Sequence, residues 1–128
     1  MRALLNLLLD THVLLWWLAA SANLSREARQ TIRSGQRVFV SAATLWEIAI
    51  KVARGTLHVQ GDLRKHLEIN HFEELPITAA HALAAGQLPR HHGDPFDRML
   101  VAQCAIESLT LVTADRQQTA YEISIILV

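Results

Sequence analysis

The sequence predicts an α/β fold, a three-layer α/β/α sandwich around a mostly parallel five-stranded sheet. Short apolar runs alternate along the chain with longer segments of helical pattern, which is the order of a βαβ protein. Several of these runs are almost continuously apolar, as expected for strands covered on both faces of a parallel sheet. A chain of 128 residues, 51% hydrophobic and 19% charged, is long and apolar enough to bury a core. We therefore expect a single domain over residues 1–128.

The first half of the chain is expected to hold two strands and four helices. Residues 3–9 and 38–40 are the strands, because both runs are short and apolar and the first stops abruptly at polar residues. The helices are expected at residues 12–20, 26–34, 44–54 and 63–70. Ser25 is a suitable cap for the second helix, and Gly35 and Gly55 are expected to end the second and third.

The second half continues the alternation. Strands are expected at residues 72–77, 109–113 and 124–128. Helices are expected at residues 79–87 and 95–107, the first of them capped by Thr78. The chain contains no internal repeat and no linker long enough to divide it, so these elements belong to one unit.

The start of the helix at 95–107 carries two acidic residues with different expected roles. Asp94 is a good N-cap and Pro95 suits the first helical turn, so capping explains Asp94 fully. Asp97 has two interpretations, because a carboxylate there either stabilises the helix dipole or serves a function. The functional interpretation is favoured if other carboxylates of the chain are expected at the same place.

Charge and cysteine content restrict the partners and the compartment. Twelve Lys and Arg balance twelve Asp and Glu, so nucleic-acid binding would need a local basic patch. The single Cys104 cannot form an internal disulfide and is expected to be a core residue in a reducing cytoplasm. Residues 3–20 are nearly all apolar, but Asp10 interrupts them at a cost of about 2.5–3.5 kcal/mol in a bilayer, so no membrane segment is expected.

Four carboxylates are expected at one edge of the sheet. Asp10 directly follows the first strand, and Asp115 lies two residues after the end of the fourth. Glu47 lies in the first turns of the helix after the second strand, and Asp97 opens the helix that leads back to the fourth. Ligands bind beyond the carboxyl ends of the strands in open parallel sheets, and all four positions belong to that edge.

Each position also has a structural explanation. Thr44 and Glu47 have the spacing of a capping box, Asp10 suits a helix cap, and Asp115 suits a turn. Together, however, clustered carboxylates repel one another unless a cation neutralises them. A site of oxygen ligands indicates Mg²⁺ or Mn²⁺. His91 and His92 lack a third partner at metal spacing and are expected to be a solvated pair.

At these positions the chain resembles the PIN-domain nucleases, specifically the VapC-type toxins of bacterial toxin–antitoxin pairs. The resemblance rests on four motifs in the same order: Leu7-Leu8-Leu9-Asp10-Thr11-His12, Trp46-Glu47-Ile48, Asp94-Pro95-Phe96-Asp97-Arg98-Met99-Leu100-Val101-Ala102-Gln103 and Leu111-Val112-Thr113-Ala114-Asp115. It implies a Mg²⁺-dependent endoribonuclease, a homodimer, and a small antitoxin that blocks the cleft. Its catalytic and metal-binding residues would be Asp10, Glu47, Asp97 and Asp115.

The resemblance also implies Thr11 and Thr113 as polar neighbours of the metal site. Gln117 and Gln118 stand where family members often carry an aromatic residue, which puts the packing around Asp115 in doubt. We expect Asp10 and Asp97 to be direct ligands, with the other two carboxylates completing the site directly or through water.

Two alternative functions remain from other classes, a receiver-type signalling module and an inactive PIN-like binding protein. The receiver needs an aspartate at the end of the third strand, where this chain has Glu74 to Thr78, and a late lysine, whereas its lysines are Lys51 and Lys65.

The surface also allows two interpretations. The helical arginines are either a phosphate track or a solvated face, and the early apolar residues either bind a partner or belong to the core. These residues are Arg26, Arg29, Arg33 and Arg37, and Leu14, Leu15, Trp16 and Trp17. Nearer the cleft, Lys51, Arg54, Arg90 and Arg98 are further candidates for RNA contact.

Overall fold

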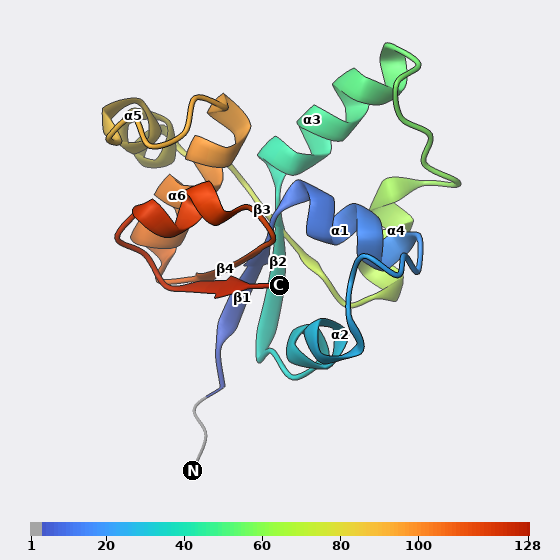
Figure 1. The fold of residues 1–128 in the computed structure, drawn as a ribbon. Helices are drawn as coiled ribbons and strands as arrows, with labels where there is room; N and C mark the ends of the chain where they lie inside the picture. The colour runs from blue at the N-terminus through green and yellow to red at the C-terminus, as the bar shows by residue number, and fades with distance from the viewer. Residues whose placement is uncertain (1–3) are drawn as a thin grey trace.

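The computed structural model describes residues 4–128 and contains a five-stranded sheet in the order β3-β2-β1-β4-β5 (Figure 1). Every neighbouring pair of strands is parallel. The strands are β1 (Asn6–Leu9), β2 (Arg37–Ser41), β3 (Glu73–Leu75), β4 (Thr110–Thr113) and β5 (Ile125–Leu127). All five predicted strands are confirmed with small changes of boundary, and Ala3 of the first lies outside the described residues.

Six α-helices connect the strands, as the sequence predicted. They are α1 (Thr11–Leu18), α2 (Arg26–Arg33), α3 (Ala42–Ala53), α4 (Leu63–Ile69), α5 (Ala79–Gln87) and α6 (Pro95–Glu107). In Figure 1, α1, α2 and α4 lie on one side of the sheet and α5 and α6 on the other. A short 3₁₀ helix, η1 (Arg116–Ala120), follows β4 and had no counterpart in the sequence prediction.

The apolar residues of β1 explain the three layers. Leu7 and Leu9 belong to a core with α1 and α2, whereas Leu8 belongs to a second core with α6. Alternate residues of a strand point to opposite faces, so a strand between two helical layers carries apolar residues at successive positions, as at Leu7, Leu8 and Leu9. The predicted α/β/α sandwich is therefore confirmed.

The strand order also determines where a ligand can bind. Counting outward from β1, the chain runs through β2 and β3 on one side and through β4 and β5 on the other. The order reverses between β1 and β4, and the carboxyl ends of these two strands form the expected crevice. Receiver-type folds have the order 2-1-3-4-5, so the receiver alternative is excluded.

The capping-box explanation for Glu47 is wrong. Helix α3 begins at Ala42, and its N-cap is Ser41, whose Oγ accepts a hydrogen bond from Ala43 N at 3.0 Å. Ser41 ends β2 and caps α3 at once, with no loop between the two elements. Thr44 is therefore already inside the helix, and Glu47 is free of any capping role.

The glycines that end two helices do so for different reasons. Gly55 has φ of +73° and follows α3 in the left-handed conformation, as predicted. Gly35 does not adopt a positive φ. A Cβ at Gly35 would lie 2.9 Å from Leu7 Cδ1, so the close packing against the Leu7 side chain of β1 favours a glycine there.

The early helix α1 contributes mainly to the core. Leu14 is fully buried, and Leu15, Trp16 and Trp17 are partly buried against the same core. The indole N–H of Trp17 donates to Asn70 Oδ1 at 2.9 Å, which fixes this side chain within the fold. Core packing therefore holds for Leu14 and in part for the other three residues. No helix in residues 4–128 is both long and apolar enough to cross a membrane.

Candidate functional site

Asp10 joins β1, α1 and β4 through its two carboxylate oxygens. Its Oδ1 accepts from Val13 N at 2.8 Å and so caps α1, while its Oδ2 accepts from the Thr113 hydroxyl. The side chain is almost completely buried, and burial raises the pKa of its carboxyl group, with a smaller contribution from Asp115. Asp10 is thus a helix cap and a member of the carboxylate cluster at the same time.

Glu47 is held by hydrogen bonds at both of its oxygens. The Thr11 hydroxyl donates to Oε1 at 2.7 Å and lies 3.2 Å from the hydroxyl of Thr44. Lys51, one turn further along α3, donates to Oε2 at 2.9 Å. Hydrogen bonds at both oxygens therefore fix the orientation of this largely buried side chain.

Asp97 lies in the first turn of α6, behind the predicted cap. Asp94 Oδ1 accepts from the backbone N–H groups of Phe96 and Asp97 at 2.8 and 3.4 Å, so capping by Asp94 is confirmed. Burial raises the pKa of Asp97 to about 7, and the negative charges of Asp94, Asp10 and Glu47 add to this effect. A cation beside Asp97 would remove that penalty.

Asp115 completes the group from the end of β4. Its Oδ1 accepts from Gln117 N at 2.9 Å and caps η1, while its own backbone N–H donates to the Thr113 hydroxyl at 3.0 Å. The neighbouring Gln118 is fully buried, and within residues 4–128 neither polar atom of its side chain has a hydrogen-bond partner. The difference from the family pattern, a glutamine where an aromatic residue is common, therefore lies in the buried packing beside Asp115.

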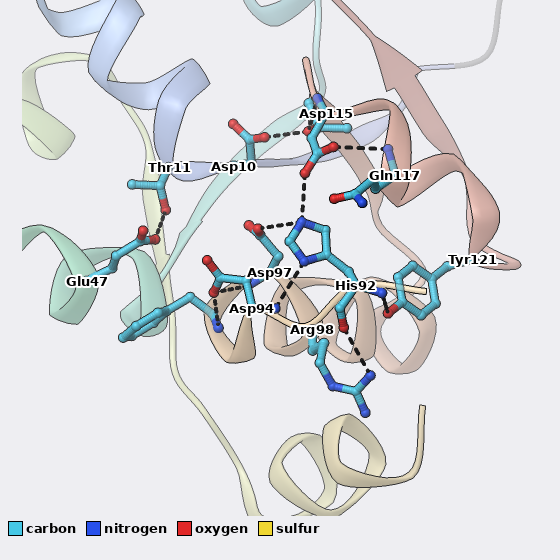
Figure 2. Close-up of polar contacts among 12 residues, drawn as sticks. Asp10, Thr11, Glu47, His92, Asp94, Asp97, Arg98, Asp115, Gln117 and Tyr121 are labelled. Atoms are coloured by element: carbon cyan, nitrogen blue, oxygen red, sulfur yellow. Dashed lines mark hydrogen bonds and ion pairs between the residues drawn. The ribbon is translucent and has the colours of Figure 1, made fainter. Parts of the chain in front are cut away.

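The four predicted carboxylates therefore lie around the crevice between β1 and β4 (Figure 2). Among residues 4–128, Asp97 and Asp115 come within metal-ligand spacing, whereas Asp10 and Glu47 lie outside that closer group but near enough for their charges to raise the pKa of Asp97. The four carboxylates come from four different segments, and Thr11 and Thr113 orient two of them. Part of the group is accessible, since the Asp97 side chain is 21% exposed and that of Asp115 is 37% exposed. The arrangement can bind a divalent cation that enters from solvent.

His92 also belongs to this group, so the prediction of a solvated histidine pair is wrong for this residue. Its Nε2 lies 2.8 Å from Asp115 Oδ2 and 3.2 Å from Asp97 Oδ2. Potential ligand atoms of His92, Asp97 and Asp115 all lie within 4.8 Å of one another, a spacing that suits a metal ion. His91 is exposed, and its ring packs edge-on against Tyr121. The only sequence signal for His92 was its position two residues before the helix cap.

Arg98 fixes the loop that carries His92 and is not free to bind phosphate. Its guanidinium group donates to the carbonyl oxygens of Ala85 and Leu88, both at 3.0 Å, and of Pro89 at 3.1 Å. A longer bond of 3.4 Å reaches the carbonyl of His92. These contacts anchor the end of α5 to α6 across the loop at 89–94.

The arginines of α2 and the start of β2, for which the sequence allowed either a phosphate track or a solvated face, mostly make contacts within the fold. Arg29 and Arg33 both lie over the ring of Trp17, and Arg29 also donates to the carbonyl oxygens of Trp16 and Ser21. Arg37 forms two hydrogen bonds with Glu73 at the amino ends of β2 and β3, the opposite edge from the carboxylates. These three arginines are therefore engaged within the fold, and Arg26 remains exposed.

An aromatic pair accompanies two of the acidic residues. Trp46 is 63% exposed, and its ring meets that of Phe96 edge-on at a centroid distance of 5.4 Å. Trp46 precedes Glu47 and Phe96 precedes Asp97 in the chain. The sequence analysis did not assign an aromatic residue to RNA binding. The position of Trp46 and Phe96, each directly before a predicted acidic site residue, could have indicated this pair.

The fold and the acidic crevice define a class of protein. A family model described as the PIN domain matches residues 7–123. The chain belongs to the PIN-domain family, which confirms the resemblance drawn from its motifs.

Individual relatives and solved structures agree with this assignment. The chain is 31% identical over 115 residues to Ribonuclease VapC22 of Mycobacterium tuberculosis (strain ATCC 25618 / H37Rv), a match that covers 88% of each sequence. Its fold is similar to that of VapBC2 from Rickettsia felis bound to a promoter DNA fragment, with a TM-score of 0.74, 13% identity and coverage of 96% of this chain and 98% of that one. FitAcB from Neisseria gonorrhoeae matches with a TM-score of 0.68, 23% identity and coverage of 93% and 95%.

Proposed function

We propose that this protein is an endoribonuclease and the toxin of a toxin–antitoxin pair, hydrolysing RNA at a divalent metal held by Asp10, Glu47, Asp97 and Asp115. The observation that carries the proposal is the group of four carboxylates at the β1–β4 crevice, in which burial and like charges raise the pKa of Asp97 to about 7. Such a group needs a cation to be fully ionised at neutral pH. The relative named Ribonuclease VapC22 supports RNA as the substrate.

The donor set fits Mg²⁺, with Mn²⁺ as a second candidate. The four proposed ligands offer only carboxylate oxygens, which are the ligands that both ions accept. Asp10 and Asp97 are the proposed direct ligands, while Glu47 and Asp115 act directly or through water. When bound, the ion would lower the pKa of a water molecule and stabilise negative charge on the scissile phosphate.

The surrounding side chains keep the carboxylates ready for this role. The Thr113 hydroxyl bonds to Asp10 and to the backbone N–H of Asp115, so it fixes the spacing of two proposed ligands. Thr11 and Lys51 hydrogen-bond to the two oxygens of Glu47 and fix the orientation of this carboxylate. Preformed geometry of this kind is what metal-assisted hydrolysis requires from the protein.

RNA would be held by a few exposed groups near the crevice. A surface pocket that includes His92 is also lined by Arg90 and Arg98, together with residues from the end of α5 and the start of α6. Because Arg98 is occupied by carbonyl groups, Arg90 is the proposed phosphate contact there, with Arg54 as a second exposed cation on the Glu47 side. The Trp46 ring can stack on an unpaired base of single-stranded RNA.

An antitoxin, a homodimer and a cytoplasmic location complete the proposal. Structures such as the VapBC2 complex from Rickettsia felis support a partner protein for this fold. Growth of cells expressing the chain, with and without the neighbouring open reading frame, tests the partnership. Rescue by the neighbour is expected, and continued growth arrest in its presence would count against the toxin function.

RNA cleavage tests the enzymatic proposal. The wild-type protein is expected to cleave RNA with Mg²⁺ and to stop when EDTA removes the metal. Asp97→Asn keeps a side chain of the same shape but loses the negative charge, and it is expected to be inactive. Equal cleavage by the two proteins would refute the assignment of Asp97, and the absence of EDTA-sensitive cleavage would favour the inactive PIN-like alternative.

A further inference from the structure

His92 is held in place by contacts on three sides. Its backbone N–H donates to the Tyr121 hydroxyl at 3.1 Å, and its backbone carbonyl accepts from Arg98 at 3.4 Å. On the ring, Nδ1 accepts from the backbone N–H of Asp94 at 3.0 Å. The side chain is only 13% exposed, so the imidazole has a fixed position between the loop and the carboxylates (Figure 2).

The contact at Nδ1 determines which nitrogen of the ring carries the proton. A nitrogen that accepts a hydrogen bond from a backbone N–H carries no proton itself. The neutral imidazole then has its proton on Nε2, the nitrogen that lies 2.8 Å from Asp115 Oδ2 and 3.2 Å from Asp97 Oδ2. His92 therefore presents an N–H donor to the carboxylates, and a protonated nitrogen has no lone pair for a metal ion.

We propose that His92 is a positioning residue of the metal site, whose Nε2–H group holds the Asp115 carboxylate beside that of Asp97 without binding the ion itself. This inference rests on the proposed function, because it assigns a role relative to the metal proposed there. It explains why the His92 ring lies within hydrogen-bond distance of two carboxylates. It also explains why the tautomer of this ring suits hydrogen-bond donation to them and not coordination of a metal ion.

The structure gives this donor a clear physical task. Asp97 and Asp115 come from different elements, α6 and the end of β4, and their like charges push the two side chains apart. An N–H group directed at both opposes that repulsion, and the Tyr121, Arg98 and Asp94 contacts keep the donor from following either carboxylate. Hydrogen-bonding partners of metal ligands typically change metal affinity by about 10- to 100-fold when they are removed.

The chain offers a matched set of variants. His92→Ala removes the donor, and His92→Gln restores an amide N–H at a similar reach. His91→Ala, in the adjacent exposed residue, is the control for disturbance of the loop. Circular dichroism and thermal melting of each variant would establish that the fold is intact before the site is measured.

The experiment measures Mn²⁺ affinity by calorimetry, together with the tautomer of His92 by ¹H–¹⁵N NMR of the metal-free protein. We expect about 10- to 100-fold weaker binding for His92→Ala, partial recovery for His92→Gln, wild-type affinity for His91→Ala, and a protonated Nε2 with an unprotonated Nδ1.

Unchanged affinity in His92→Ala, or a proton on Nδ1, would overturn the positioning role while leaving the proposed function in place. Directly bound nitrogen in the electron spin-echo spectrum of the Mn²⁺ complex would make His92 a ligand and overturn it too. No Mn²⁺ binding by the wild-type protein would instead refute the metal site itself, and this inference with it.

Discussion

Replacement of Asp97 by asparagine should change how the stability of the metal-free protein depends on pH. The folded-state pKa of Asp97 is raised from the ordinary 3.8 to about 7, because of burial and the surrounding carboxylates. Between these two values the folded protein binds a proton that the unfolded chain has released. The stabilising proton is therefore fully present below about pH 4, and stability falls as the pH rises towards 7.

The size of the effect follows from the same pKa. Each pKa unit corresponds to about 1.4 kcal/mol, so the wild type should lose at most about 4 kcal/mol through Asp97 between pH 4 and pH 8. The amide side chain of the Asp97→Asn variant cannot ionise, so this contribution disappears. Asp10, whose pKa is raised mainly by burial, acts in the same direction in both proteins, so most of its contribution cancels in the comparison.

Urea unfolding in EDTA, repeated from pH 4 to pH 8, measures the effect. The free energy of unfolding of Asp97→Asn minus that of the wild type should increase across this range. Saturating Mg²⁺ should then stabilise the wild type at pH 8, by about 2.7 kcal/mol at a concentration 100 times the dissociation constant, and the variant much less. A difference between the two proteins that does not change with pH would refute the reasoning.

Two further perturbations address other parts of the site. Thr113→Val removes the hydroxyl that bonds to Asp10 and to Asp115 N while keeping the shape, and it should cost about 1–3 kcal/mol in urea unfolding because buried polar groups lose their partner. A cost below about 0.5 kcal/mol would show that this hydroxyl does not organise the two carboxylates. Trp46→Ala should raise KM for a short single-stranded RNA by a factor of about 5–160, matching about 1–3 kcal/mol of base stacking, with little change in melting temperature because Trp46 is 63% exposed. An unchanged KM would exclude Trp46 from RNA binding.

The fold and the carboxylate group could be predicted because both depend on regular geometry. Unbroken apolar runs identified the parallel strands, and the residue after a parallel strand has to lie at the carboxyl edge of the sheet. That reasoning located Asp10 and Asp115 directly. It located Asp97 as well, because the Asp94–Pro95 pair marks where α6 begins and therefore which residue lies in its first turn.

What the sequence did not predict depends on side-chain contacts between segments far apart in the chain. His92 lies in a loop whose course is set by Arg98 and Tyr121, and neither contact follows from a periodic pattern. The arginines of α2 had a spacing suited to a phosphate track, yet Trp17 from α1 takes two of them. The second strand was expected to end at Val40, and only the direct passage from β2 to α3 shows that Ser41 ends the strand and caps the helix.

The most direct test of the central claim is a divalent-metal titration of RNA cleavage by EDTA-treated protein, with the ends of the products identified. If the carboxylate group at the β1–β4 crevice holds a metal that activates water, Mg²⁺ or Mn²⁺ should restore cleavage in a saturable manner, and the products should end in ordinary phosphate and hydroxyl groups. Cleavage that continues without any metal, or products that carry a 2′,3′-cyclic phosphate from attack by the RNA's own 2′-hydroxyl, would contradict the account.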